Sequence, residues 1–316
     1  MDKIIFFHMN QLGDLLFSLP ILEATRKQYP NIKIYSVVKQ NLVELLDSTG
    51  LVDKIFIKEK SFVKRLKLIK DIKRENIQTA VLFSESPETL ITAFLSNIKK
   101  RFGFKTASLK FLLTNKVNKI GVPSLSNNIT LAQSIGLTKT KENYVDLINI
   151  NPKMSDIVSQ WLKDNNVDSN FIVISMGASA RRQEKCLNNN VWVETIDKLQ
   201  DKKIKIVVVG AQWEKKNIED ILSKCHNKVN IFCPEGGLLE LAALIKQSKL
   251  FIGIDSGTMH LSASLGIKCI ALYGNTDPNQ IGPQPLNDHI IIKKSNIKDI
   301  KSDDIINTLE KNEREI

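Results

Sequence analysis

Residues 253–261 read Gly-Ile-Asp-Ser-Gly-Thr-Met-His-Leu, and the rest of the chain can be interpreted outward from this stretch. The apolar run before it, at 250–252, predicts a strand, and the apolar-rich residues after it, up to Gly266, predict a helix. A strand that turns at once into a helix leaves backbone N–H groups unpaired at the strand's carboxyl end. Such a turn can bind an anion, and a diphosphate would suit it. The alternative is an ordinary capped helix with a solvent-facing histidine.

Four residues of this turn are candidate ligands for that anion. Asp255 or Ser256 can cap the helix, Gly257 lets a ligand approach the backbone closely, and His260 brings a side-chain donor to the same turn. These four residues are therefore candidates for binding a phosphate-containing substrate, and the ordinary capped helix stays open until the following residues are considered.

The residues that follow point to a family. Residues 267–274 predict another buried strand, and Asn-Thr-Asp-Pro at 275–278 and Ile-Gly-Pro at 281–283 come next. The block 253–283 resembles the C-terminal signature of the family 9 glycosyltransferases, the ADP-heptose:lipopolysaccharide heptosyltransferases. In that family an Asp-(Ser/Thr)-Gly-x-x-His-Leu turn is followed by a strand and a Gly-x-Thr-Asp-Pro loop.

The composition indicates a globular protein with room for two domains. The chain has 316 residues, of which 42% are hydrophobic and 25% are charged. No apolar run is long enough to span a membrane, and residues 1–8 carry no cleavage-site pattern, so we expect a soluble chain in the cytoplasm. The cysteines lack metal-ligand spacing and are expected to be reduced thiols. They are Cys186, Cys225, Cys233 and Cys269.

The formal net charge of +11 is concentrated in the front half of the chain. Residues 1–150 hold 23 Lys and Arg against 13 Asp and Glu, whereas residues 151–316 hold 22 against 21. The run 58–74 is the most basic, and it either is a solvated helix face or contacts a polyanion, such as an acidic membrane surface or an acidic acceptor. It lacks interleaved aromatic residues, so we expect no nucleic acid. The candidate acceptor-binding residues in this run are Lys58, Lys60, Lys64 and Arg65.

Buried strands alternate with helical stretches along the whole chain, which predicts parallel sheets with helices on both faces. Strands are expected at residues 3–7, 32–38, 54–57 and 79–84, and again at 171–176, 204–209, 229–233, 250–254, 267–273 and 289–292. Two such series predict an α/β chain with two doubly wound, Rossmann-like domains.

The domain boundary is expected at the polar stretch 149–152, just before a new helix. The family resemblance implies a GT-B fold in which the two domains face an interdomain cleft. It also implies an N-terminal acceptor-binding domain at 1–150 and a C-terminal nucleotide-sugar-binding domain at 151–300. The charged tail 301–316 is expected to be a helix that packs back on the N-terminal domain.

A dinucleotide-binding oxidoreductase would show a similar alternation of strands and helices. After the first expected strand, however, residues 8–14 contain one glycine where that fingerprint requires three. Neither residues 176–179 nor 210–212 supply it, so the sequence disfavours this class.

Asp14 is the candidate catalytic base. Residues 12–16 and the following Ser-Leu-Pro at 18–20 resemble the Gly-Asp-x-x-x-x-x-Pro opening of family 9. The resemblance implies that Gly13 permits a tight turn and that Asp14 takes the proton of an attacking sugar hydroxyl, a role that a carboxylate within hydrogen-bond reach can perform. The alternative is that Asp14 only caps a helix.

The back domain contains further donor-binding candidates, assigned by the same resemblance. Residues 175–179 resemble the family's Pro-Gly-Ala-Ser turn, which includes Ser179. Lys185 matches a phosphate-binding lysine, with Arg181 as the substitute if the register differs. Here the loop is longer and lacks the tryptophan that follows the lysine in the family, and the alternative is an exposed basic loop.

Residues 207–214 resemble the family's strand, glycine turn and glutamate, and the resemblance implies that Glu214 binds the ribose hydroxyls. A carboxylate suits a vicinal diol because it can accept both hydrogen bonds. The alternative is that Glu214 is a first-turn residue favoured by the helix dipole. Residues 234–239 occupy the loop that contacts adenine in the family.

The family implies an inverting, metal-independent transfer of heptose from ADP-L-glycero-D-manno-heptose to the lipopolysaccharide inner core. No cofactor or metal site is expected beyond this nucleotide-sugar substrate. The partner would be a lipid-linked lipopolysaccharide precursor, met at the cytoplasmic face of the inner membrane. The alternatives are a family 9 transferase with another sugar or acceptor, including a protein, and a non-catalytic homologue that binds a nucleotide sugar. The oligomeric state is left open.

Overall fold

The computed structural model describes residues 2–59, 61–121, 123–168, 170–177 and 183–312. The chain divides into two compact units, a front unit of Met1–Asn149 and a back unit of Ile150–Ile316. The division falls beside the polar stretch 149–152.

The front unit is built on one six-stranded sheet in which every neighbouring pair of strands is parallel. The strand order is β3-β2-β1-β4-β5-β6. The strands are β1 Lys3–Phe7, β2 Lys33–Val38, β3 Lys54–Ile57, β4 Thr79–Leu82, β5 Lys100–Phe104 and β6 Asn115–Val117. Because β1 lies between β2 and β4, the chain reverses its direction of travel across the sheet at β1. The carboxyl end of β1 is therefore a topological switch point, the usual place for a ligand site in such a sheet.

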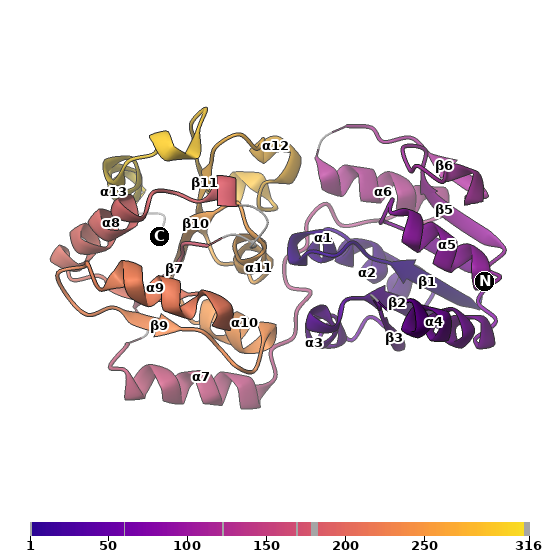
Figure 1. The fold of residues 1–316 in the computed structure, drawn as a ribbon, viewed down its shortest axis with the longest axis horizontal. Helices are drawn as coiled ribbons and strands as arrows, with labels where there is room; N and C mark the ends of the chain where they lie inside the picture. The colour runs from indigo at the N-terminus through magenta and orange to yellow at the C-terminus, as the bar shows by residue number, and fades with distance from the viewer. Residues whose placement is uncertain (1, 60, 122, 169, 178–182, 313–316) are drawn as a thin grey trace. The chain divides into compact units, whose positions relative to one another are not determined.

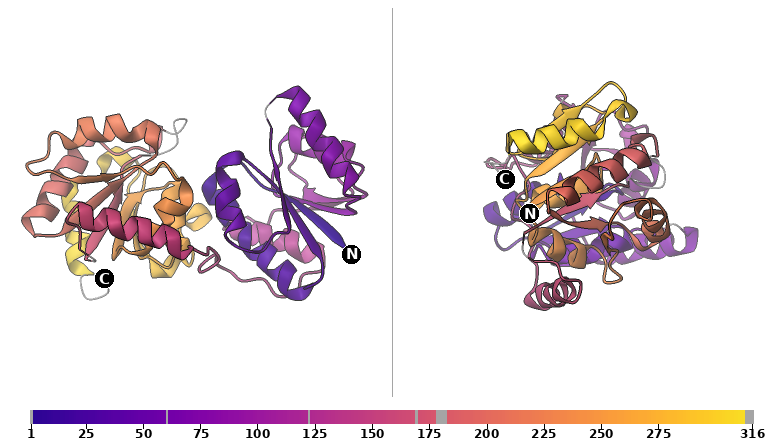
Figure 2. Two further views of the ribbon diagram at one scale, coloured as in Figure 1. Left: turned by 90° about the horizontal axis from the view of Figure 1, so that it is seen from below. Right: turned by 90° about the vertical axis from the view of Figure 1, so that its left-hand side faces the viewer.

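Helices cover both faces of this sheet (Figures 1 and 2). The helices are α1 Leu12–Leu16, α2 Leu19–Gln28, α3 Val43–Asp47, α4 Phe62–Arg74, α5 Pro87–Leu95 and α6 Ser124–Ser134. α4 and α5 pack side by side over a core of buried strand residues, and α2 and α6 pack together on the opposite face. Local sequence sets the starts: α5 begins with Pro87 after Ser86, whose hydroxyl accepts a hydrogen bond from the Thr89 N–H.

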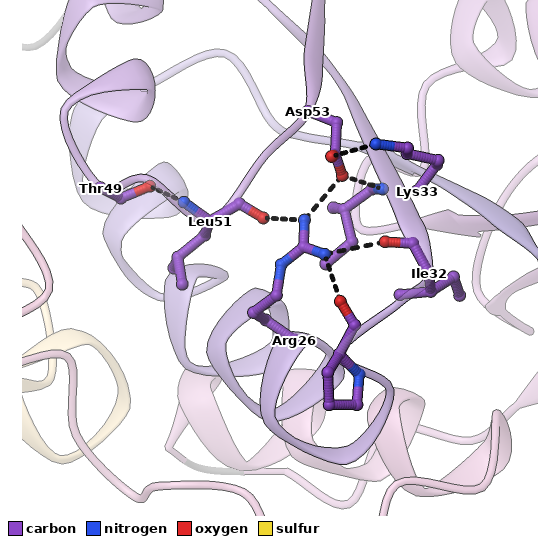
Figure 3. Close-up of polar contacts among 8 residues, drawn as sticks. Arg26, Ile32, Lys33, Thr49, Leu51 and Asp53 are labelled. Atoms are coloured by element: carbon purple, nitrogen blue, oxygen red, sulfur yellow. Dashed lines mark hydrogen bonds and ion pairs between the residues drawn. The ribbon is translucent and has the colours of Figure 1, made fainter.

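A polar cluster at the amino-terminal ends of β2 and β3 connects the end of α2 to β2 and to the segment before β3 (Figure 3). The Arg26 guanidinium donates to the carbonyl of Ile32 at 2.8 Å, to the carbonyl of Leu51 at 3.2 Å and to the Asp53 carboxylate at 2.6 Å. Lys33 donates to the other Asp53 oxygen at 3.1 Å. These contacts satisfy backbone carbonyls that no strand pairs, so the cluster has a structural role.

The back unit repeats the architecture with a second parallel six-stranded sheet in the order β12-β11-β10-β7-β8-β9. The strands are β7 Phe171–Ser175, β8 Lys205–Val209, β9 Asn230–Phe232, β10 Leu250–Ile254, β11 Cys269–Tyr273 and β12 Ile290–Lys293. β7 and β10 are neighbours from which the chain moves outward in opposite directions. The crevice at their carboxyl ends is this sheet's switch point.

The helices of the back unit also lie on both faces of its sheet. They are α7 Pro152–Asp164, α8 Asn189–Asp201, α9 Lys215–Leu222, α10 Leu238–Lys246, α11 Gly257–Ser264, α12 Pro278–Ile281 and α13 Ser302–Lys311. α8, α9 and α13 share one apolar core with the strands, and α10 contacts α7 and α11. No helix among the described residues is both long and apolar enough to cross a bilayer.

The last helix packs within the back unit, and its expected packing on the N-terminal domain stays a prediction. α13 lies against α8 of its own unit (Figure 1), where Ile305, Ile306 and Leu309 are buried in the back-unit core. Lys198 of α8 also donates to Ser302 at 2.9 Å. The physical reason is the apolar stripe of α13, which is buried against the nearest open sheet face.

Candidate active site

The stretch 253–261 forms the strand, turn and helix that its sequence predicts. β10 ends at Ile254, α11 begins at Gly257, and the Ser256 hydroxyl caps the helix by accepting a hydrogen bond from the Met259 N–H at 3.3 Å. Of the two capping candidates, Ser256 is therefore the one that caps. Asp255 is left to interact with other side chains at the carboxyl end of β10.

Asp255 pairs with Lys185. The Lys185 ammonium donates to Asp255 Oδ2, and the two side chains are only 17% and 6% exposed. Lys185 ends a short 3₁₀ helix, η3 Gln183–Lys185, in the segment that follows β7. The sequence match at Lys185 and the match at Asp255 thus meet at the β7–β10 switch point, although they are 70 residues apart.

His260 lies in the first turns of α11 and is buried, with 4% of its surface exposed. Burial lowers the pKa of its imidazole to about 4; the negative charge of Asp255 opposes this shift, and the charges of Lys185 and His289 add to it. His260 is therefore neutral at pH 7, and its ring can both donate and accept a hydrogen bond. The alternative of a solvent-facing histidine is wrong.

Glu214 ends the 3₁₀ helix η4 Gln212–Glu214, just after β8. Its Oε2 accepts a hydrogen bond from the Ala211 N–H at 2.8 Å, and a Cβ atom placed on Gly177 would lie 2.0 Å from its Oε1. Burial raises the pKa of Glu214, and the Ala211 hydrogen bond opposes this. The carboxylate therefore lies directly over the backbone of the β7 turn, in a place that requires glycine beneath it.

A pocket of about 290 Å³ opens beside the Gly177–Glu214 contact, at the carboxyl ends of β7 and β8. Its lining combines apolar side chains with amide and carboxylate groups in about equal measure. Its lining includes Met176, Gly177, Leu187, Asn189, Trp213, Glu214 and Asn217. Two predicted donor-binding residues, Ser179 and Arg181, lie outside the described residues.

In the front unit, Gly13 and Asp14 lie in α1, immediately beyond the carboxyl end of β1. Burial raises the pKa of Asp14 to about 6, and a hydrogen bond from the backbone N–H of Gln11 opposes this shift. Gln11 is the residue before the helix, so Asp14 does help to cap α1. Capping and base chemistry are compatible, since one carboxylate can accept several hydrogen bonds.

A buried histidine, His8, supports this turn, a role that no local sequence motif indicates. His8 Nδ1 lies 2.7 Å from Ser18 Oγ, and His8 Nε2 lies 3.1 Å from Ser36 Oγ. Ser18 donates its only proton to the Leu15 carbonyl at 2.6 Å, so Nδ1–H donates to Ser18 and Nε2 accepts from Ser36. Burial lowers the pKa of His8 to about 3, which keeps it neutral. Only the tertiary structure brings the two serines to the histidine.

Three cations gather at the same edge of the front sheet. Burial lowers the pKa of Lys58; Glu88 raises it, and the charges of Lys39 and Arg65 lower it further. Arg65 pairs with Glu88 at 3.2 Å. Lys39 follows β2 and Lys58 follows β3, so the parallel strands bring these two cations to one edge of the sheet. Lys39 was not among the predicted site residues, because its segment carries no motif that marks it.

Two further acceptor-binding candidates were predicted, Lys60 and Lys64. Lys64 is exposed and lies 3.7 Å from Glu59. Lys60 lies outside the described residues.

Comparisons with known proteins agree with the fold. The model of Glycosyltransferase family 9 (heptosyltransferase) matches residues 65–311. Lipopolysaccharide heptosyltransferase 3 of Escherichia coli strain K12 is 24% identical over 290 residues, covering 85% of this chain and 81% of that protein.

Two solved structures share the fold. The family 9 glycosyltransferase of Veillonella parvula superposes with a TM-score of 0.87 at 19% identity, covering 100% of this chain and 98% of that one. The E. coli heptosyltransferase WaaC with ADP superposes with a TM-score of 0.77 at 19% identity, covering 98% and 99%. The predicted α/β fold of GT-B type is confirmed. Because the family model matches most of the chain, the protein belongs to glycosyltransferase family 9 and is a glycosyltransferase.

Proposed function

We propose that this glycosyltransferase moves a heptose from ADP-L-glycero-D-manno-heptose to the inner core of lipopolysaccharide, with inversion at the anomeric carbon. The observation that carries the proposal is the group at the β7–β10 switch point, where the Lys185–Asp255 pair, the start of α11 and the buried His260 meet. The names of the relatives, which are lipopolysaccharide heptosyltransferases, support the choice of sugar and acceptor.

The diphosphate of the donor is assigned to the back unit. Lys185 supplies a cation, the first turn of α11 supplies backbone N–H groups, and neutral His260 can donate one further hydrogen bond. These groups stabilise the negative charge that builds on ADP as it leaves, so we propose that the reaction needs no metal ion. The solved complex of a relative with ADP supports a nucleoside diphosphate as the ligand of this fold.

The ribose is assigned to Glu214. Its Oε1 projects over Gly177, and its Oε2 is already held by the Ala211 N–H. This fixed carboxylate can accept hydrogen bonds from a vicinal diol. The neighbouring pocket of about 290 Å³ then holds part of the nucleoside.

Asp14 is assigned the role of general base. The acceptor hydroxyl oxygen attacks the anomeric carbon, and a new C–O bond forms as the bond to the diphosphate oxygen breaks. The electron pair of that bond leaves with ADP, and the hydroxyl proton passes to Asp14. A carboxylate with a pKa of about 6 is a stronger base than an ordinary aspartate and is still ionised at pH 7.

The acceptor is assigned to the front unit because three cations lie at the edge that carries Asp14. Lys39, Lys58 and Arg65 are opposed there by Glu88. An excess of positive charge favours an acceptor with phosphate or carboxylate groups, which the inner core of lipopolysaccharide carries.

A nucleotide titration followed by a transfer assay tests this function. ADP, UDP, GDP and CMP are titrated against the melting temperature in the presence of a metal chelator, because a ligand of the native state raises that temperature. We expect ADP to raise the melting temperature and the other three nucleotides to leave it unchanged. In the transfer assay, we expect heptose to pass from ADP-heptose to heptose-deficient lipopolysaccharide. Stabilisation by another nucleotide would be compatible with a glycosyltransferase but would contradict ADP-heptose as its donor. Binding of ADP without transfer to any acceptor would indicate a non-catalytic homologue.

A further inference from the structure

The first two turns of α4 expose three large apolar side chains. Phe62 is 69% exposed, Val63 is 74% exposed and Leu66 is 48% exposed, while the buried stripe of the same helix is formed by Leu68, Ile69 and Ile72. Phe62, Val63 and Leu66 therefore lie outside the core that holds α4 to the sheet. A cluster of exposed apolar residues within five positions calls for a partner, whereas single exposed ones do not.

The later turns of α4 expose cations on the same side of the helix. Lys67, Lys70 and Lys73 are exposed and form no ion pair within the described residues. The outer surface of α4 thus changes from apolar at its start to basic at its end. We call Phe62, Val63, Leu66, Lys67 and Lys70 the α4 surface.

We propose that the α4 surface docks the front unit on an anionic lipid bilayer. Apolar side chains beside lysines on one face of a helix are the pattern of helices that lie in the membrane interface. The apolar residues enter the boundary between headgroups and acyl chains, and the lysines contact acidic headgroups. The positive charge of the front half of the chain adds a longer-range attraction to the same surface.

The position of α4 gives this docking a purpose, which rests on the proposed function. α4 follows β3, so its apolar first turns lie at the carboxyl edge of the front sheet, where Asp14 and Lys58 also lie. Figure 1 shows α4 and α5 together on this unit, and Ile91 of α5 adds a further exposed apolar side chain. A bilayer held at this edge would present a lipid-linked acceptor to the base. The docking itself can be tested without any substrate.

Co-sedimentation with lipid vesicles tests the proposal. The full chain is mixed with vesicles of phosphatidylethanolamine and phosphatidylglycerol, and with vesicles of phosphatidylcholine alone. We expect binding to the anionic vesicles that weakens with added salt. The triple substitution Phe62→Ser, Val63→Ser and Leu66→Ser should lower the affinity by about tenfold or more. Lys67→Gln and Lys70→Gln should each lower it by about fivefold.

The matched control is Phe111→Ser, which removes an apolar side chain that is 71% exposed elsewhere on the front unit. This variant should bind vesicles as the unmodified chain does. Absence of binding to anionic vesicles, or equal binding by the triple variant, overturns the proposal. Loss of binding in the Phe111 variant also overturns it, since the effect would not be specific to α4.

A second readout separates this proposal from the proposed function. The triple variant should keep its melting temperature and its transfer to a water-soluble, deacylated acceptor fragment, and lose transfer to the acceptor embedded in vesicles. If no acceptor is modified by any form of the chain while vesicle binding depends on α4, the docking stands and the proposed function fails. If transfer to embedded acceptor survives in the triple variant, the docking has no role in the reaction and its proposed purpose is rejected.

Discussion

The ammonium of Lys185 and the carboxylate of Asp255 form an ion pair at the carboxyl ends of β7 and β10. Asp255 is nearly buried, so Lys185 is the group that compensates its charge. The same lysine is the predicted phosphate ligand. The proposed function therefore predicts that nucleotide binding and the stability of the back unit are coupled through this side chain.

Lys185→Ala should both destabilise the chain and weaken ADP binding. The free energy of unfolding should fall by about 2–4 kcal/mol, because a buried carboxylate loses its partner. The affinity for ADP should fall by about 10- to 100-fold through loss of a charged hydrogen bond. Denaturant unfolding and calorimetric titration measure the two effects. Asp255→Asn is the comparison: it should cost less stability, since the freed lysine can reach water, and a larger cost would contradict this account.

Asp14→Asn should abolish transfer and stabilise the fold. The folded carboxyl has a pKa of about 6, above the unfolded value of 3.8, so the folded chain binds the extra proton and is destabilised as pH rises between these values. The variant should therefore gain about 1–3 kcal/mol over the unmodified chain above pH 6 and nothing near pH 3. The turnover number at saturating donor tests the effect on transfer, and denaturant unfolding at several pH values tests the effect on stability. Near-normal turnover would remove Asp14 from the base role and leave it as a helix cap.

Transfer by the unmodified chain should rise with pH through about 6, because the base acts only when ionised. The profile of kcat/KM against pH reports this group in the free enzyme. The affinity for ADP-heptose, measured without acceptor over the same range, should not follow that profile. Asp14 is assigned no contact with the donor, and the esterified diphosphate of the nucleotide sugar lacks the proton that free ADP loses at about pH 6. A profile that is flat between pH 5 and 7 would argue against this base.

Gly177→Ala should weaken nucleotide binding through Glu214. The new methyl group would lie 2.0 Å from Glu214 Oε1, so the carboxylate must leave its place over the turn. We expect a loss of about tenfold in ADP affinity. The effect should vanish when Glu214→Ala is made first, because no carboxylate remains to be displaced. If Gly177→Ala still lowered ADP affinity about tenfold in the Glu214→Ala background, the loss would come from a change in the backbone and not from the displaced carboxylate.

His8→Gln should make the chain less sensitive to acid. The pKa of His8 is about 3 in the folded chain, below its ordinary value of 6.5, so the unfolded chain binds an extra proton between these values. Its contribution to stability is complete above pH 6.5 and is lost as pH falls toward 3. Between pH 3 and 6.5, the unfolding free energy of the variant should rise with pH less steeply than that of the unmodified chain, by about 1.4 kcal/mol per pH unit. Parallel curves for the two proteins would contradict the assignment of a neutral buried histidine.

Sequence patterns predicted the back sheet more fully than the front one. All six back-unit strands were expected, because each contains apolar residues that stand out from the more polar residues flanking it. β5 and β6 were missed. β5 begins with Lys100 and Arg101, and β6 has only three residues, so neither shows an apolar run. β5 exists because β4 offers it an edge to pair with, and β6 pairs in turn with β5.

The residues of the candidate site were found by their local motifs, but their partners were not. Lys185 and Asp255 were each selected from their own segment, and nothing in the sequence pairs them. The same holds for Lys39 beside Lys58 and for the two serines around His8. Pairing across parallel strands depends on strand order, which local patterns do not contain.

The sequence by itself determined the α/β class, the two units and the turns that carry the chemistry, because strand and helix periods and glycine turns are local properties of the chain. Only the tertiary structure decided which turns meet at one sheet edge, that α13 is buried in the back unit, and that His260 and Asp14 have shifted pKa values. Those properties arise from burial and from contacts between distant segments, which exist only once the sheets have formed.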